Sequence, residues 1–108
     1  MEQADWPEGL YKEAALIDIS GPDVERKTGK KLAWSFDDLD EYEYVIFGKN
    51  DDYALRRYKR SPVGGFTLII REGDAEYHAK QFNGFIEEYG VDSESVKWKD
   101  LNEYKFDQ

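Results

Sequence analysis

The chain has 108 residues, which is the usual size of one compact domain. Hydrophobic residues make up 40% of it and aromatic residues 16%, so it has enough apolar material to fold although 36% of it is charged. The lack of cysteine excludes disulfides, catalytic thiolates and cysteine-ligated metals. The net charge of −9 repels nucleic acid and anionic lipid and attracts basic partners. No leader or membrane-spanning stretch is evident, so we expect a cytoplasmic protein without membrane association.

The N-terminal region is compatible with either a helix or a strand. Leu10, Ala14 and Ile17 fall on one face of a helix, whereas residues 16–19 also suit a short strand. We expect a short N-terminal helix over residues 9–19, with a strand as the alternative.

A change from helical to strand spacing follows at Gly29. Asp23 is suited to cap a short helical turn that Gly29 ends. Beyond it, the large side chains of Leu32, Trp34 and Phe36 alternate with small or charged residues. This period of two predicts a strand that buries the face carrying those three side chains.

Three further strands are predicted at residues 42–47, 53–58 and 66–71, which are rich in aromatic and β-branched residues. The loops between them, 48–52 and 61–65, contain the glycine, asparagine, aspartate and proline typical of turns. Because the connections are short, the strands are expected to pair in sequence order. The pattern predicts an antiparallel meander.

The clearest helix signal follows the meander. Asp74 is suited to cap the helix and Gly90 to end it. Between them, apolar residues recur at spacings of three and four: Ala75, Ala79, Phe82, Phe85, Ile86 and Tyr89. Val96 and Trp98 alternate with lysines and predict a short last strand.

The predicted fold class is therefore α+β. A single acidic domain over 1–108 contains an antiparallel meander of four to five strands, with one main helix at about 74–89 packed on one face, and a short N-terminal helix. Segments 1–8 and 102–108 are expected to be flexible.

No recognisable catalytic or metal site accompanies this fold. His78 is the only histidine, so a multi-histidine metal site is excluded, and its place on the main helix indicates a solvated or half-packed side chain. No serine lies in a G-x-S-x-G context, and the acids of residues 37–43 lack the spacing of a calcium loop. We expect no catalytic residue, no metal and no cofactor. An enzyme with a dispersed carboxylate site remains an alternative.

Charge is segregated along the chain. A first acidic cluster contains five acids and no base: Asp37, Asp38, Asp40, Glu41 and Glu43. The basic segment after it, residues 49–60, contains Lys49, Arg56, Arg57, Lys59 and Arg60 against Asp51 and Asp52. If the two segments pair as strands, opposite charges meet across the hairpin, and each pair stabilises the sheet by about 0.2 to 1 kcal/mol.

A second acidic cluster lies toward the C-terminus and contains Glu87, Glu88, Asp92 and Glu94. We interpret the two acidic clusters as the partner-binding face of a non-enzymatic protein. An inhibitor or immunity-type protein, including one that mimics DNA, would use such a face to occlude a basic partner protein, for example a nuclease or another nucleic-acid-processing protein. The sequence leaves the oligomeric state open.

The main alternative is a small module that binds RNA or single-stranded DNA. Its candidate residues form one basic and aromatic strand: Tyr53, Arg56, Arg57, Tyr58, Lys59 and Arg60. The acidity of the rest of the chain opposes this use, so nucleic acid is the less favoured partner.

One short segment resembles a known family. The sequence Val24-Glu25-Arg26-Lys27-Thr28-Gly29-Lys30-Lys31-Leu32, followed by an alternating strand, resembles the first helix-to-strand junction of phage uracil-DNA glycosylase inhibitors. These are small, acidic, cysteine-free DNA mimics, so the resemblance implies an inhibitory function. It covers nine of the 108 residues, and the main helix after the meander departs from that family. No functional residue is carried over.

Overall fold

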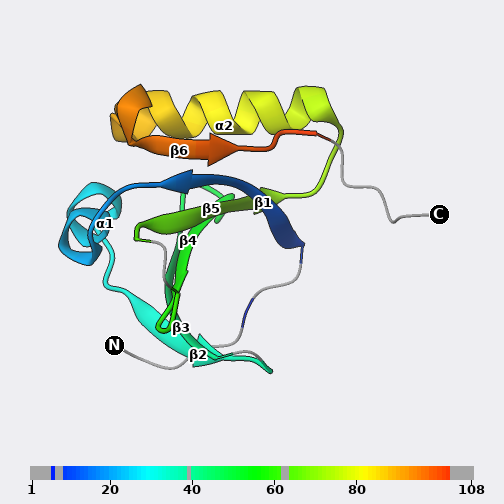
Figure 1. The fold of residues 1–108 in the computed structure, drawn as a ribbon. Coiled ribbons are helices and arrows are strands. Elements are labelled where there is room, and N and C mark those ends of the chain that lie inside the picture. Colours follow the sequence, from blue (N-terminus) through cyan, green and yellow to red (C-terminus); the bar gives the residue numbers. More distant parts are fainter. Residues whose placement is uncertain (1–5, 7–8, 39, 62–63, 103–108) are drawn as a thin grey trace.

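A computed structural model describes residues 6, 9–38, 40–61 and 64–102 of the chain (Figure 1). Its elements, in chain order, are β1 (Leu10–Ile17), α1 (Gly21–Thr28), β2 (Ala33–Phe36), β3 (Glu41–Phe47), β4 (Tyr53–Tyr58), β5 (Phe66–Arg71), α2 (Ala75–Tyr89), the 3-10 turn η1 (Ser93–Ser95) and β6 (Val96–Lys99). The predicted α+β class is confirmed.

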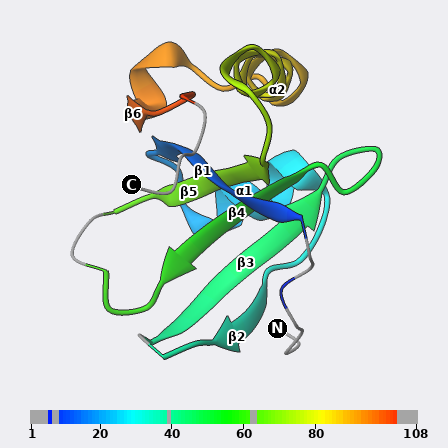
Figure 2. The same ribbon diagram turned by 90° about the vertical axis from the view of Figure 1, so that its right-hand side faces the viewer.

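All six strands belong to one antiparallel sheet with the order β2-β3-β4-β5-β1-β6. Strands β2 to β5 form the predicted meander. Figure 2 shows the sheet rising from β2 at the bottom to β6 at the top, with α2 beside the upper strands. The sheet has more strands than predicted because β1 joins it between β5 and β6.

The prediction of a helix over residues 9–19 is wrong, because this segment forms β1. Its residues Ala14, Ala15, Leu16 and Ile17 are all buried. A strand that is paired on both edges and covered on both faces loses the alternation that identifies a half-exposed strand. Irregularities in the register with β5 and β6 disturb the alternation further. The helical spacing of the apolar residues was therefore misleading.

Both helices begin and end at residues whose side chains or backbone suit a cap. The side chain of Ser20, rather than that of Asp23, caps α1 by accepting the Asp23 N–H at 3.3 Å. Asp74 caps α2 by accepting the Tyr77 N–H at 2.8 Å, as predicted. Gly29 and Gly90 end the two helices with φ of 71° and 62°. The short helix of the fold is thus residues 21–28.

The main core lies between α2 and one face of the sheet. Phe85 of α2 is buried with its ring centroid 6.0 Å from that of Phe47 and 5.8 Å from that of Tyr53. Val24 brings α1 into the same core. A smaller cluster on the opposite face contains Leu10, Ala54 and Ile69, with Trp6 packed against it.

The prediction that β2 buries Trp34 and Phe36 is wrong, because Phe36 is 60% exposed and Trp34 is half-buried. The buried residue of this strand is Ser35. Strand β2 is the sheet edge on the side away from α2, so no helix covers its aromatic face (Figure 1). The predicted alternation is present, but its apolar side faces solvent.

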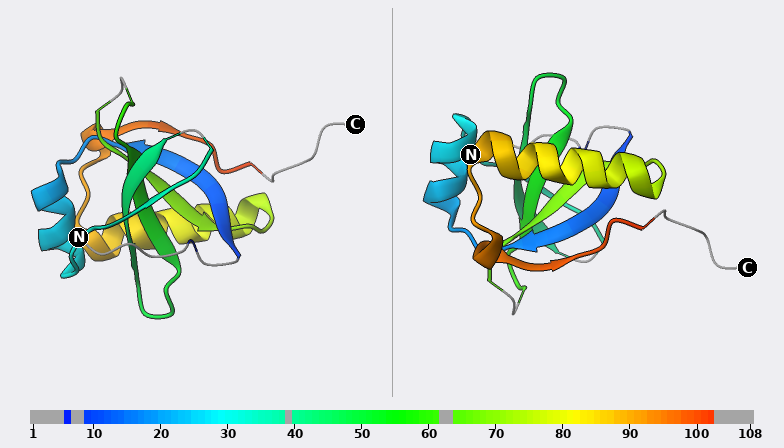
Figure 3. Two further views of the ribbon diagram at one scale, coloured as in Figure 1. Left: turned by 90° about the horizontal axis from the view of Figure 1, so that it is seen from below. Right: turned by 90° about the horizontal axis from the view of Figure 1, so that it is seen from above.

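The C-terminal segment is fastened across β1. Seen from above, α2 and β6 run side by side and are joined through η1 (Figure 3). The Asp100 N–H donates to the Ala14 carbonyl at 2.8 Å, and the Asp100 carboxylate lies 3.3 Å from the buried Lys12 ammonium. Apart from Trp6 and Asn102, the ends that were expected to be flexible lie outside the described residues.

The two adjacent glycines before β5 should respond very differently to alanine. Gly65 has φ of 92°, and a Cβ placed there would lie 2.3 Å from the Ile17 carbonyl oxygen. At Gly64 a Cβ would meet nothing within 4 Å. We expect Gly65→Ala to lower the free energy of unfolding by at least about 2 kcal/mol and Gly64→Ala to change it little. Urea denaturation checks this, and equal stability of the two variants would contradict the packing of the turn against β1.

Candidate functional site

The first acidic cluster lies at the start of the β3–β4 hairpin and is largely paired with the basic segment. In the sheet register, Glu43 lies opposite Arg57. The Arg57 Nε lies 3.0 Å from Glu43 Oε1, and the Lys59 ammonium lies 2.7 Å from Glu41. The expectation that these charges meet across the hairpin is confirmed. Two of the five acids that looked like an exposed face, Glu41 and Glu43, are therefore paired within the chain.

The turn itself adds two more contacts to this balance. The Asp40 carboxylate accepts the backbone N–H of Arg60 at 2.9 Å and lies 3.7 Å from its guanidinium. The Tyr58 hydroxyl donates to Asp37 at 2.5 Å. Asp38 is exposed and has no ion pair with any described residue. The charges of Asp40, Glu41 and Glu43 are thus offset within the chain, whereas Asp38 keeps its charge exposed.

The basic and aromatic strand is divided between the two faces of the sheet. Tyr53 is buried in the main core, and Arg57 lies on the same face, with its guanidinium carbon 4.7 Å from the centre of the Phe66 ring. Arg56 and Tyr58 lie on the other face. No base could stack on Tyr53 unless the core opened.

Arg56 is enclosed by the aromatic rings of that second face. Its guanidinium carbon lies 5.2 Å from the ring centre of Trp6, 5.5 Å from Tyr42 and 5.1 Å from Tyr58. The Glu13 carboxylate lies 3.2 Å away, and the Arg56 side chain is only 13% exposed. Such cation–π contacts fix the guanidinium within the fold. Arg56 therefore acts as a structural cation in this arrangement.

The second acidic cluster has a different environment. Glu87 and Glu88 are exposed at the C-terminal end of α2, and Asp92 and Glu94 are exposed around η1. No ion pair in the described part of the chain involves any of the four. Their charges are therefore directed to solvent.

The backbone of α2 adds to this negative charge. The last turn of α2 contains no basic residue, so the helix dipole reinforces the acids. Lys27 offsets part of this charge by donating to the carbonyls of Tyr89 and Gly90 at 3.1 and 3.2 Å. Burial, followed by the charge of Glu88, raises the pKa of the Tyr89 hydroxyl. This end of the molecule is therefore strongly negative.

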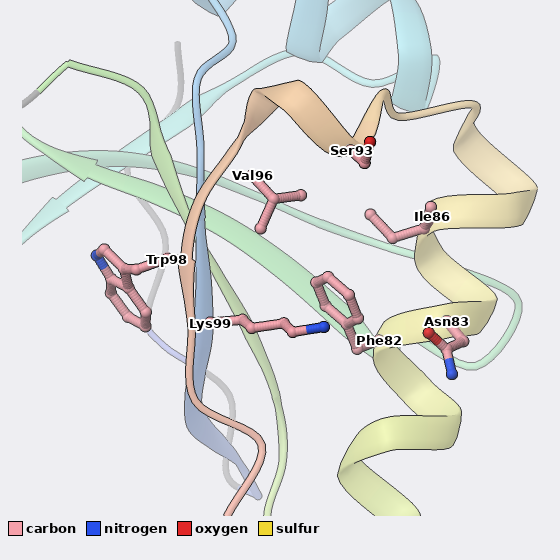
Figure 4. Close-up of a pocket in the computed structure, with 7 residues that line it drawn as sticks. All are labelled: Phe82, Asn83, Ile86, Ser93, Val96, Trp98 and Lys99. Atoms are coloured by element: carbon pink, nitrogen blue, oxygen red, sulfur yellow. The ribbon is translucent and has the colours of Figure 1, made fainter.

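A mostly apolar groove lies beside the second acidic cluster, between α2 and β6. It has a volume of about 300 Å³ and is lined by Phe82, Asn83, Ile86, Ser93, Val96, Trp98 and Lys99. Figure 4 shows Lys99 extending from β6 toward Phe82, and the ammonium lies 5.3 Å from the centre of that ring. Trp98 is 44% exposed. The lining contains no carboxylate among the described residues, so it lacks the acid pair of a glycosidase-type site.

The two acidic clusters do not form one continuous face. The first lies at the β2–β3 end of the sheet, and the second lies at the α2 end of the molecule (Figure 1). The length of β3 separates the two clusters. The strand begins at Glu41, in the first cluster, and ends at Phe47, whose ring lies 5.0 Å from that of Tyr89 near the second cluster. Their positions in the sequence gave no indication that the two clusters lie at different ends of the molecule.

His78 is fully buried, which differs from the solvated or half-packed side chain expected from sequence. Its Nε2 accepts the Gly73 N–H at 2.9 Å, and its Nδ1 lies 3.1 Å from the Leu101 carbonyl and 3.2 Å from that of Asn102. This pattern assigns the proton to Nδ1. The imidazole joins the start of α2 to the segment after β6, so its polar atoms are engaged within the fold.

Comparisons with known proteins give no further guidance. No protein-family model, curated protein or solved structure matches the chain. Across the described residues there is no group of three side chains suited to hold a metal ion. None of the helices in the same residues is long and apolar enough to cross a membrane. The functional argument therefore depends on the surfaces of this chain alone.

The contact between Tyr58 and Asp37 should be visible in the pH dependence of stability. Burial and the hydrogen bond to Asp37 raise the pKa of Tyr58 to about 12 from 10.0, with Arg56 acting in the opposite direction. A raised pKa means that the folded state holds this proton more tightly than the unfolded chain does. The contribution is therefore present below pH 10 and is lost between about pH 10 and 12.

We expect Tyr58→Phe to flatten the decline in unfolding free energy across that range, as measured by urea denaturation at successive pH values. Tyr11→Phe, at an exposed position on β1, is the matched control. An unchanged slope in Tyr58→Phe would show that this proton is not held by the folded state.

Proposed function

We propose that this chain is a non-enzymatic binding protein that docks on a basic partner protein and occludes it. The observation that carries the proposal is the unequal pairing of the two acidic clusters. Acids of the first cluster are matched by Arg57, Lys59 and Arg60, whereas the second has no ion-pair partner among the described residues. Unpaired surface charge of one sign speeds the encounter with a partner of the opposite sign and helps to orient it.

The docking surface that we propose consists of Glu87, Glu88, Asp92, Glu94 and Trp98. The indole supplies the apolar area that charge alone does not, since aromatic side chains contribute strongly to binding energy at interfaces. The adjoining groove between α2 and β6 offers additional apolar contact. A charged rim beside an apolar centre is the usual organisation of a protein–protein interface.

Within this class we favour an inhibitor or immunity-type protein directed at a nuclease or another nucleic-acid-processing protein. Such proteins present basic surfaces that bind phosphates, and a group of exposed carboxylates is suited to compete for them. The alternative of an RNA or single-stranded DNA module has weaker support, because Tyr53 is buried and Arg56 is enclosed by aromatic rings. A cytoplasmic location remains part of the proposal.

The test is an affinity capture from the source cells that compares two double charge reversals. Glu87→Lys with Glu88→Lys alters the proposed surface, and Glu72→Lys with Glu76→Lys is the control, since it changes the net charge equally at exposed acids near the other end of α2. Circular dichroism establishes that both variants are folded. We expect the first variant to weaken binding of the captured basic protein by about tenfold or more and the control to weaken it little.

The complex should also dissociate in about 1 M salt, where the Debye length is about 3 Å. Two results would contradict the proposal. One is an equal loss of binding in both double variants, which would indicate a response to net charge rather than to this surface. The other is unchanged binding in Glu87→Lys with Glu88→Lys.

A further inference from the structure

The second feature that points to a partner is the free edge of β2, at the opposite end of the sheet from β6. The Lys59 N–H donates to the Glu41 carbonyl at 2.9 Å, so the backbone of Glu41 faces β4. Backbone groups alternate in direction along a strand. The backbone N–H and C=O groups of Tyr42 and Tyr44 therefore point toward β2.

The same alternation shows which groups of β2 are left over. Ala33 lies opposite Tyr44, and Ser35 lies opposite Tyr42. The backbone groups of Ala33 and Ser35 therefore form the hydrogen bonds between β2 and β3. The N–H and C=O groups of the other two residues, Trp34 and Phe36, point away from the sheet. No described strand pairs with them. The edge can accept another strand.

The side chains at this edge are unusually apolar for an exposed strand. The rings of Trp34 and Phe36 stack with their centroids 6.5 Å apart and an interplanar angle of 28°. Phe36 is one of three large hydrophobic side chains that are exposed in the described residues. Exposed edge strands that are left open in solution usually carry charge or proline within the strand. In β2 the charges are instead outside the strand, at its two ends.

The signs of those end charges are opposite. Lys30 and Lys31 precede β2, and Asp37 and Asp38 follow it. If the register of an antiparallel pair of β2 strands centred on Trp34 continues beyond the strand ends, Lys31 lies opposite Asp37 of the second copy. Lys30, which also donates to the Ile46 carbonyl at 3.1 Å, then lies opposite its Asp38. A parallel pair would place like charges together. The order of the signs therefore selects the antiparallel arrangement of two identical edges.

We infer that β2 pairs with β2 of a second copy of this chain, antiparallel and centred on Trp34, so that the two sheets become continuous. Residues Trp34 and Phe36 supply both the backbone groups and the rings of this interface. The arrangement is two-fold symmetric, as most homodimer interfaces are. It does not depend on the docking surface at α2, which is on another part of the molecule (Figure 1).

The dimer is expected to be weak and reversible. Stable interfaces bury at least about 1,200 Å² in total, and a strand of four residues contributes only part of that area. Two pairs of opposite charges at the ends of the strands make the association sensitive to salt. The dimer should therefore form at high protein concentration and dissociate on dilution or in high salt.

Sedimentation velocity between about 10 and about 500 µM measures this association. Two variants test it at exposed side chains that have no ion pair with the described residues: Lys31→Glu and Asp38→Lys. We expect each variant alone to raise the dissociation constant about tenfold or more, because it places like charges opposite each other. An equal mixture of Asp38→Lys with a third variant, Lys30→Glu, should associate again, because positions 30 and 38 then carry opposite signs across the interface. Lys80→Glu and Glu76→Lys, on α2, are the controls for charge and should dimerise as the unmodified chain does.

Hydrogen exchange locates the contact. The amides of Trp34 and Phe36 should exchange more slowly as the protein concentration rises, whereas those of β6 should not change. Three results would overturn the inference: a single monomeric species at every concentration, a dimer that is equally strong in Lys31→Glu and Asp38→Lys, or concentration-dependent protection at β6 instead of β2.

Discussion

The insertion of β1 between β5 and β6 is the constraint on which the rest of this fold depends. Without it, β2 to β5 would form a simple meander, and β6 would have no strand to pair with. The insertion requires a segment that tolerates burial on both faces, which Ala14 and Ala15 satisfy because they are small. The ion pair between Lys12 and Asp100 and the hydrogen bond from Asp100 to Ala14 then hold the C-terminal segment against the same strand.

This constraint also explains which parts of the fold could be predicted from sequence. Strands β4 and β5 and the helix α2 occur at the predicted residues, because turn residues and caps such as Asp74 and Gly90 are local signals. Strand β1 was predicted as a helix, with a short strand over 16–19 as the alternative, because the half of it that is buried on both faces contains no period of two. The burial of His78 could not be predicted either. Its partners, Gly73 and Leu101, are 28 residues apart in sequence and meet only after β6 has paired with β1.

The candidate site could be predicted only in part, for a related reason. Sequence identified two acidic clusters and one basic segment, and it indicated that some charges would pair across the hairpin. It did not distinguish a paired cluster from an unpaired one. That difference depends on register. The 48–52 loop places Glu43 opposite Arg57, whereas Glu87 and Glu88 lie at a helix end and form no ion pair with any described residue. In the folded chain, the unpaired negative charge is therefore greatest at the C-terminal end of α2 and not in the most acidic stretch of the sequence.

The two edges of the sheet therefore have different surroundings. At β6, α2 and the groove flank the strand, and lysines alternate with Val96 and Trp98, so the surface combines an apolar centre with unpaired acids nearby. At β2, α1 reaches the residue before the strand, where Glu25 accepts the Leu32 N–H at 2.9 Å, and charges of opposite sign stand at the two ends of the strand. A surface on which unpaired acids predominate attracts a partner of opposite sign and repels its own copy. An edge strand with positive charge at one end and negative charge at the other attracts its own copy when the two strands run antiparallel. The same net charge of −9 is thus consistent with both kinds of association, because each depends on the local order of charges rather than on their sum.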